Sequence, residues 1–137
     1  MTIGKKNKEL EVLVIEDNET FRKLAIDMLH GYVVHSAVSA VSGLAKFKKY
    51  NPDITFIDIG LPDGSGINIV KDIKSLNPNA FMVMLTASNL QKDVKDSLKN
   101  GARGYIVKPF SRQKIKECVE QYNSIADKLT KTKPANE

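Results

Sequence analysis

The chain has 137 residues, of which 42% are hydrophobic and 27% are charged, a composition that suits one globular domain with a real core. The net charge is +5, but the lysines are scattered, with small groups at both chain ends. That distribution is more typical of solubilising tails than of a nucleic-acid-binding stripe. The single cysteine, Cys118, excludes an internal disulfide and favours a reducing compartment, so we expect a cytoplasmic protein. No apolar stretch approaches the roughly 20 residues of a membrane span, and no signal peptide follows the N-terminal lysines.

Short apolar runs alternate with amphipathic stretches from Glu9 onward. The runs have the length of strands, and the stretches repeat their apolar residues at the spacing of one helix face. Glycine or Asn-Pro pairs separate several of them. The expected strands are residues 12–15, 32–36, 53–57, 80–85 and 103–107. The expected helices are residues 20–30, 39–50, a stretch that includes 69–76, then 88–100 and 111–128, the last with Ser111 as its N-cap.

A strand followed by a helix, repeated five times with short connections, predicts parallel strands joined by right-handed crossovers. The expected fold is therefore an α/β three-layer sandwich with a doubly wound sheet. We expect one domain over residues 9–128, between a flexible segment 1–8 and a polar tail 129–137. The run 80–85 is almost wholly apolar, as in a central strand covered on both faces. The stretch 88–100 has few large apolar residues, so we expect this helix to pack weakly.

Polar residues follow four of the expected strands at their carboxyl ends. Glu16 and Asp17 follow the first, Asp58 the third, Thr86 the fourth and Lys108 the fifth. Taken singly, each has an ordinary explanation, such as a solvated cap, a turn residue or a surface charge. Because the carboxyl ends of parallel strands share one sheet edge, and ligands bind at that edge, the recurrence predicts a single pocket. Three carboxylates, a hydroxyl and an ammonium would meet there.

These groups suit phosphoryl transfer to a carboxylate. Clustered carboxylates oppose one another's ionisation, and a hard dication such as Mg²⁺ relieves the repulsion. The Asp58 carboxylate is placed to attack phosphorus and form an aspartyl-phosphate. The Thr86 hydroxyl and the Lys108 ammonium would then bind phosphoryl oxygens. A cis bond between Lys108 and Pro109, which proline makes accessible, would aim the lysine back at the pocket.

The whole set of motifs resembles the receiver domain of two-component response regulators. The resemblance covers about residues 9–127, and the motifs occur in the order that the family has them. It is closest to the stand-alone type similar to chemotaxis regulators. The matching positions are Glu16-Asp17, the phosphoacceptor Asp58 with Leu61-Pro62 and Gly66 after it, Thr86-Ala87, the aromatic Tyr105, and Lys108-Pro109-Phe110.

This resemblance implies the flavodoxin-like receiver fold, with five parallel strands in the order 2-1-3-4-5. It implies that Asp17, Asp58 and the backbone carbonyl of Gly60 hold Mg²⁺, while Glu16 acts mainly through bound water. It also implies that the only chemistry is self-phosphorylation and slow autodephosphorylation, so the chain is not expected to be an enzyme.

The resemblance implies protein partners as well. A histidine kinase or a histidine phosphotransfer protein would supply the phosphoryl group. Phosphorylation would draw Thr86 toward that group and let Tyr105 turn inward. The face formed by residues 88–100, 103–107 and 111–128 would change shape and bind a downstream effector protein. The chain would be a monomer or a phosphorylation-dependent dimer, without direct nucleic-acid binding or membrane insertion.

Other functions remain as alternatives. The first is a protein-interaction module of receiver fold that works without phosphorylation. A phosphatase with an aspartyl nucleophile commonly has a second acid two residues further on, where this chain has Gly60. A nucleotide-binding module needs a glycine-rich phosphate loop after its first strand, and acids at that place repel pyrophosphate. We interpret His30 and His35 as structural residues rather than phosphohistidines.

Overall fold

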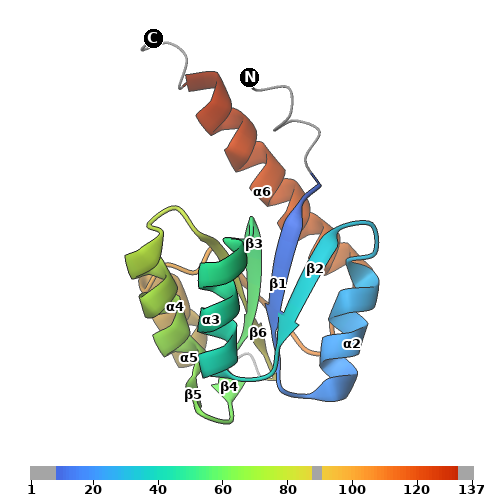
Figure 1. Ribbon diagram of the computed structural model, residues 1–137, viewed down its shortest axis with the longest axis vertical. Coiled ribbons are helices and arrows are strands. Elements are labelled where there is room, and N and C mark those ends of the chain that lie inside the picture. The colour runs from blue at the N-terminus through green and yellow to red at the C-terminus, as the bar shows by residue number, and fades with distance from the viewer. Residues whose placement is uncertain (1–8, 88–90, 133–137) are drawn as a thin grey trace.

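Parallel strands form the central sheet of the computed structural model, which describes residues 9–87 and 91–132. Within the described residues the sheet has five strands in the order β2-β1-β3-β6-β7 (Figure 1). This is the predicted order 2-1-3-4-5, because a separate two-stranded pair takes the labels β4 and β5. The strands are β1 (Glu11–Ile15), β2 (Val33–Ala37), β3 (Ile54–Asp58), β4 (Gly60–Leu61), β5 (Gly64–Ser65), β6 (Phe81–Thr86) and β7 (Gly104–Val107).

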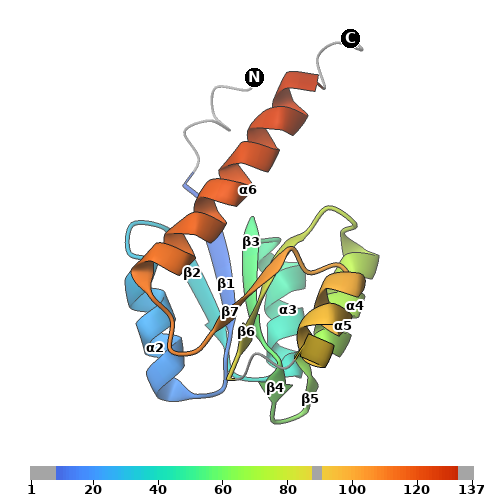
Figure 2. The same ribbon diagram turned by 180° about the vertical axis from the view of Figure 1, so that it is seen from behind.

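Helices cover both faces of this sheet and complete the predicted flavodoxin-like three-layer sandwich. Helices α2 and α6 lie on one face, and α3 and α4 lie on the other, with α5 beside α4 (Figures 1 and 2). The far end of α6 stands clear of the sheet. The helices are α2 (Glu19–Met28), α3 (Ala40–Tyr50), α4 (Gly66–Leu76), α5 (Gln91–Lys99) and α6 (Arg112–Thr132).

Two apolar clusters, one on each face of the sheet, form the core. Successive side chains of a strand point to opposite faces, so Val12 and Val14 of β1 join the cluster under α2 and α6. Leu13 and Ile15 join the cluster under α3 and α4. Strands β3 and β6 are buried throughout. The sequence predicted this for the run 80–85, and β3 and β6 are indeed adjacent inner strands of the sheet.

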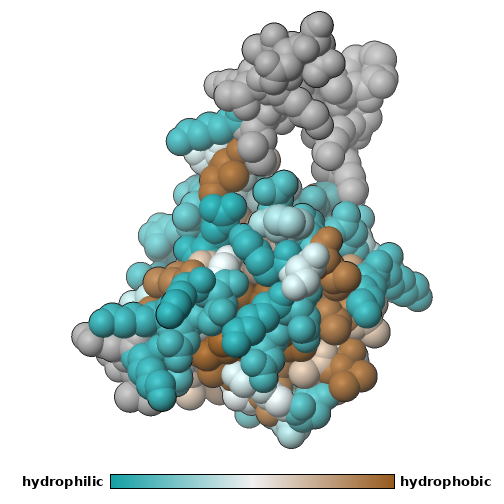
Figure 3. Space-filling model, turned by 90° about the vertical axis from the view of Figure 1, so that its left-hand side faces the viewer, coloured by the Kyte–Doolittle hydropathy of each residue, from teal (hydrophilic) through white to brown (hydrophobic). Residues whose placement is uncertain are grey.

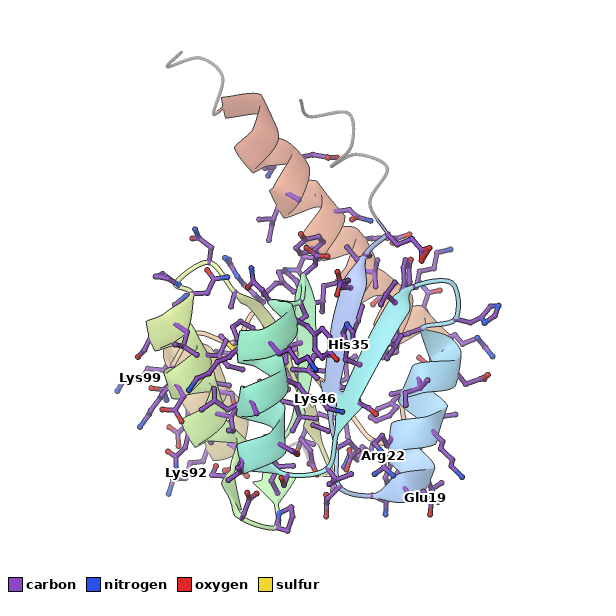
Figure 4. All side chains as sticks on the ribbon, in the orientation of Figure 1. Glu19, Arg22, His35, Lys46, Lys92 and Lys99 are labelled. Atoms are coloured by element: carbon purple, nitrogen blue, oxygen red, sulfur yellow. The ribbon has the colours of Figure 1, made fainter. Side chains whose placement is uncertain are left out.

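Helix α5 is attached differently from the other helices. None of its described side chains, residues 92–99, belongs to either apolar cluster. Its fully buried residue is Ser97, whose hydroxyl donates to the Asp93 carbonyl oxygen over 2.8 Å, while Leu98 is 43% exposed. Lys92 and Lys99 lie on its outer side (Figure 4). The weak packing expected from the sequence is therefore what these side chains show.

Short polar residues fix where the helices begin. The side chain of each N-cap accepts a hydrogen bond from a backbone N–H of the first turn, which satisfies a group that has no partner inside the helix. Ser111 accepts from the Lys114 N–H over 3.2 Å, as predicted. The other such caps are Asn18 of α2, Ser39 of α3 and Ser65 of α4.

Two details differ from the sequence-based expectations, and some expected segments lie outside the described residues. The antiparallel pair β4–β5 lies between β3 and α4, where no strand was expected. Helix α6 continues to Thr132, beyond the predicted end at Lys128, because the first proline after it is Pro134 and nothing earlier stops a helix. Residues 88–90 of the expected helix 88–100 lie outside the described residues. Segment 1–8 and residues 133–137 of the predicted tail lie outside them as well. The predicted domain bounds, 9–128, stay a prediction.

Polar contacts tie α3, α6 and the sheet together at the end where the strands begin. The His35 Nε2 lies 3.0 Å from Glu11 Oε1, and its ring stacks on Tyr50 with centroids 3.8 Å apart. The Tyr122 hydroxyl of α6 donates to Asp53 over 3.3 Å. Figure 4 shows His35 between the sheet and α3. These contacts give His35 the structural role that we expected.

The outer surface is largely polar. On the side of α4, long hydrophilic side chains cover much of the face, with hydrophobic atoms between them (Figure 3). Across residues 9–87 and 91–132, no helix combines the length and the apolar character that crossing a membrane would require. Cys118 is free and only partly buried, and burial raises the pKa of its thiol to about 11.

Candidate functional site

Three carboxylates meet at the carboxyl end of the sheet. Glu16 and Asp17 follow β1, and Asp58 ends β3, which pairs with β1 in parallel register, Ile15 opposite Ile57. One oxygen from each carboxylate lies within 4.8 Å of the others. Glu16 is fully buried, Asp58 is buried and Asp17 is exposed. The sequence predicted this cluster, and the parallel pairing of β1 and β3 explains it.

The Lys108 side chain brings a cation to the same cluster. Its Nζ lies 2.7 Å from Glu16 Oε1 and 3.4 Å from Asp58 Oδ1, and the side chain is only 8% exposed. The Glu16 contact is an ion pair without hydrogen-bond geometry, so Oε1 is a buried oxygen with no hydrogen-bond donor. The other oxygen, Oε2, accepts from the Asn18 N–H over 3.1 Å. A buried, desolvated oxygen of this kind is costly to leave without a further partner.

The electrostatics of the cluster act most strongly on Asp58. Burial, followed by a hydrogen bond with Glu16 and charge repulsion from Glu16, raises the pKa of this carboxyl from 3.8 to about 7. Lys108 lowers the pKa of Asp58, and a hydrogen bond with Asp17 raises it, but both effects are smaller. In the metal-free protein, Asp58 therefore holds a proton until the pH approaches neutrality.

The remaining predicted residues surround this cluster. Thr86 ends β6 one position after Leu85, the partner of Asp58 in the β3–β6 pairing, and it is buried. The Gly60 N–H donates to Asp58 Oδ1 over 3.2 Å. The peptide bond between Lys108 and Pro109 is cis. Tyr105 lies on β7 and is 45% exposed. The roles assigned to these residues from the sequence stay predictions.

Hydrogen bonds hold the loops of the site in ways that the sequence analysis did not foresee. The Arg22 guanidinium donates from Nη1 to the backbone carbonyls of Glu16 and Asp17 over 3.1 and 3.2 Å. Arg22 comes from the start of α2, at the end of the molecule where the strands end (Figure 4). Asp63, in the turn between β4 and β5, accepts from the Ala40 and Val41 N–H groups over 2.6 and 3.0 Å. The turn is thereby tied to the start of α3.

Gly66 is needed because the chain passes close to Asp58. A Cβ at position 66 would lie 2.2 Å from the backbone carbonyl oxygen of Asp58, a distance that no real side chain tolerates. The sequence analysis noted Gly66 only as a family feature of the loop. No local pattern in the sequence signals this approach, since it depends on how α4 starts against β3.

Phe21 is a further residue of the site, and nothing in the sequence singled it out. The Lys108 Nζ lies over its ring, 4.8 Å from the centroid. The ring also meets Phe110 with centroids 5.6 Å apart and planes tilted by 56°. An aromatic residue on the first turn of α2 therefore forms part of the wall of the site.

The donor set fits a hard divalent cation. Mg²⁺ prefers oxygen ligands and retains water, and this cluster offers three carboxylates. Among the described residues, these three carboxylates have one recorded ion-pair partner, Lys108, which leaves the cluster with a deficit of positive charge. A dication bound here would reduce that deficit, with Asp17 exposed at the solvent side.

A separate hollow lies beside β7, away from the carboxylates. Its volume is about 490 Å³, and it is open to solvent. Tyr105 and Val107, both partly exposed, contribute to it together with residues at the start of α6. The lining residues are Tyr105, Ile106, Val107, Pro109, Ser111 and Lys114. The hollow lies on the face that the sequence analysis predicted to bind partners.

Comparison with known proteins supports the same interpretation. The model of the response regulator receiver domain matches residues 12–120. The chemotaxis protein CheY of Bacillus subtilis is 31% identical over 113 residues, covering 80% of this chain and 94% of that protein.

Solved structures resemble the fold closely. A CheY-like response regulator receiver domain from Methanospirillum hungatei superposes with a TM-score of 0.82 at 25% identity, covering 88% of this chain and 99% of that one. A CheX–CheY–BeF₃–Mg complex from Borrelia burgdorferi contains a chain with a TM-score of 0.80 at 28% identity, covering 86% of this chain and 92% of that one.

Proposed function

We propose that this chain, which belongs to the response regulator receiver domain family of two-component signal transduction, accepts a phosphoryl group on Asp58. The observation that carries the proposal is the buried Asp58 carboxylate beside Glu16, with the Lys108 ammonium 3.4 Å from its Oδ1. A nucleophile, a cation and additional metal-ligating acids thus occupy one pocket. These are the groups that phosphoryl transfer needs, because that reaction depends mainly on positioning and charge neutralisation.

Mg²⁺ is the proposed cofactor. Asp17, Asp58 and the Gly60 carbonyl would hold it, with Glu16 acting through bound water. When bound, the ion would neutralise charge on the carboxylates and on the incoming phosphoryl group. The comparison with the Borrelia complex, which contains Mg and BeF₃, supports this choice of ion for the family. The acidic cluster described above supports it for this chain.

The side chains divide the chemistry among them. An Asp58 oxygen forms the new bond to phosphorus while the bond from phosphorus to the donor breaks, and the donor leaves with the bonding electrons. With a phosphohistidine donor, the leaving imidazole takes up a proton. The Lys108 ammonium neutralises one phosphoryl oxygen, and the Thr86 hydroxyl donates a hydrogen bond to another. The donor is a histidine kinase or a histidine phosphotransfer protein.

The same event is proposed to change the face formed by α5, β7 and α6. Thr86 moves toward the phosphoryl group, Tyr105 turns inward, and the face binds a downstream effector protein. Two observations support this assignment. Leu98, Tyr105 and Val107 expose large apolar side chains there, and no described side chain of α5 belongs to either apolar cluster. A helix held in this way shifts at small energetic cost.

Intact-mass spectrometry tests the phosphoacceptor. The chain is incubated with acetyl phosphate, with and without Mg²⁺, as wild type and as Asp58→Asn. Asp72→Asn, an exposed aspartate of α4, is the matched control. We expect one phosphoryl adduct in the wild type and in Asp72→Asn, and none in Asp58→Asn or without Mg²⁺. An adduct of equal yield in Asp58→Asn would refute the assignment.

The absence of any adduct in the wild type would favour the alternative, an interaction module of receiver fold that works without phosphorylation. The switch is tested separately with beryllium fluoride and Mg²⁺ as a phosphoryl mimic. A fluorinated tyrosine at position 105 should show a changed ¹⁹F resonance on addition of the mimic. The change should be lost in Thr86→Ala, and an unchanged response in that variant would contradict the proposed role of Thr86.

A further inference from the structure

Within the part of the chain that the structure describes, three side chains are recorded around the Lys108 ammonium, and one of them carries no charge. Glu16 and Asp58 supply carboxylate oxygens at 2.7 and 3.4 Å. The third neighbour is the ring of Phe21, with its centroid 4.8 Å from Nζ. The negative face of an aromatic ring attracts a cation at this distance, and the attraction grows when the cation is desolvated. With only 8% of the side chain exposed, Lys108 meets that condition.

The ring is itself fixed in place. Phe110, which is 6% exposed and two residues after Lys108, packs against it at a tilt of 56°. Phe21 also packs on the apolar cluster beneath α2 and α6. The ring therefore has little freedom to turn its face away from the ammonium. The arrangement joins the first turn of α2 to the segment that follows β7.

The ring differs from the two carboxylates in one respect that matters for function. Both carboxylates belong to the cluster that we propose to bind Mg²⁺. A bound dication would share their negative charge and repel the ammonium, so their hold on Lys108 would weaken. The ring is not a metal ligand, and its attraction for the ammonium does not depend on occupancy of the metal site.

We infer that Phe21 is a positioning residue for phosphoryl transfer, whose ring face keeps the Lys108 ammonium beside Asp58 when Mg²⁺ occupies the carboxylates. The inference rests on the proposed function, since it concerns the lysine that neutralises a phosphoryl oxygen. The competing explanation is that Phe21 only fills the core, in which case any apolar side chain of similar size would serve.

Ring fluorination separates the two explanations. Fluorine atoms withdraw electron density from the ring face and weaken its attraction for a cation, while the size of the side chain changes little. Phenylalanine analogues with one, two and three ring fluorines are therefore placed at position 21 of the full chain. The same analogues at position 47 are the matched control, because Phe47 is 3% exposed in the cluster on the opposite face of the sheet.

Two quantities are measured. The first is the upfield ring-current shift of the Lys108 ε-methylene protons by NMR, with and without Mg²⁺, in the wild type and in Phe21→Leu. The second is the rate of phosphorylation by acetyl phosphate. We expect the upfield shift to persist with Mg²⁺ and to vanish in Phe21→Leu. The rate should fall stepwise with each fluorine at position 21, by about 2-fold to 30-fold in all, with little change from position 47.

Either of two results would overturn the inference. One is a rate that does not respond to fluorine at position 21, and the other is a ring-current shift that disappears when Mg²⁺ is added. Failure of the proposed function gives a different outcome, since no adduct would then form on Asp58 in the unmodified chain. In that case the ring-current shift, which needs no phosphoryl group, still decides whether the ring holds the ammonium.

Discussion

Replacing Asp58 by asparagine should stabilise the metal-free protein at alkaline pH. Burial, followed by Glu16, raises the pKa of Asp58 from 3.8 to about 7. Between these two pH values the folded state retains a proton that the unfolded state has already released. The free energy of unfolding contributed by this carboxyl therefore falls as pH rises from about 4 to about 7, and it stays low above that range. Asparagine does not titrate, so the variant lacks this loss.

The size of the effect follows from the same values. The whole interval between 3.8 and about 7 corresponds to an upper limit of about 4 kcal/mol, because one pKa unit is worth about 1.4 kcal/mol. Solvent at the open side of the site and the coupling between Asp58 and Glu16 both reduce the part of that energy that belongs to Asp58. We therefore expect Asp58→Asn to be more stable than the wild type by about 2 kcal/mol at pH 8, and by much less at pH 4. For a domain of this size, the difference is about 6 °C in Tm.

Urea denaturation of both proteins in EDTA at pH 4 and pH 8, followed by circular dichroism, measures this difference. Taking the difference between the two proteins removes the contributions of all other titrating groups. A second series with millimolar Mg²⁺ should raise the free energy of unfolding of the wild type at pH 8 and have a smaller effect on the variant. The reasoning would be refuted by a variant that is less stable than the wild type at pH 8, or by equal differences at both pH values.

Four other substitutions probe the surroundings of the site. Asp63→Ala removes the carboxylate that accepts hydrogen bonds from the first two amides of α3, and these amides lower the pKa of Asp63. The Tm of the variant should therefore be lower than that of the wild type at neutral pH. The difference should shrink as the pH falls below 3.8, because the carboxylate then takes up a proton. Gly66→Ala forces a Cβ against the Asp58 carbonyl and should lower the free energy of unfolding, measured in urea, by about 3 kcal/mol. Gly60→Ala is the control, because a Cβ there meets nothing within 4 Å, and it should change the free energy of unfolding little. Lys108→Ala should destabilise the fold by about 3 kcal/mol, since it leaves a buried glutamate unpaired; calorimetric titration should still detect Mg²⁺ binding, but the ¹⁹F resonance at position 105 should no longer respond to beryllium fluoride.

The parts of the site that the sequence predicted are those that depend on strand order alone. Glu16, Asp58, Thr86 and Lys108 each follow or end an apolar run, and in a parallel sheet that position determines which edge they reach. The parallel arrangement followed from the alternation of strands and helices, and the strand order came from the family resemblance. No further knowledge of side-chain packing was needed.

The parts that were missed depend on contacts between separate elements. Phe21 looks like any apolar residue of an amphipathic helix, and only the approach of the first turn of α2 to the segment after β7 brings its ring to Lys108. Asp63 looks like an ordinary turn residue until its carboxylate is found on the first amides of α3. In both cases the partner lies far away in the sequence, where no local pattern points to it.

The attachment of α5 has a consequence for the energy that signalling requires. An element that opens locally exposes its amides to hydrogen exchange with a free energy well below that of global unfolding. Because the described part of α5 contributes nothing to either apolar cluster, its amides should exchange sooner than those of α6, which buries Ile115 and Val119. Reversing a 99:1 preference between two positions of a helix takes about 5.5 kcal/mol. Because no described side chain of α5 anchors it in an apolar cluster, we expect this helix to start from a smaller preference, so that the charge change proposed at Asp58 would redistribute its positions at a lower cost.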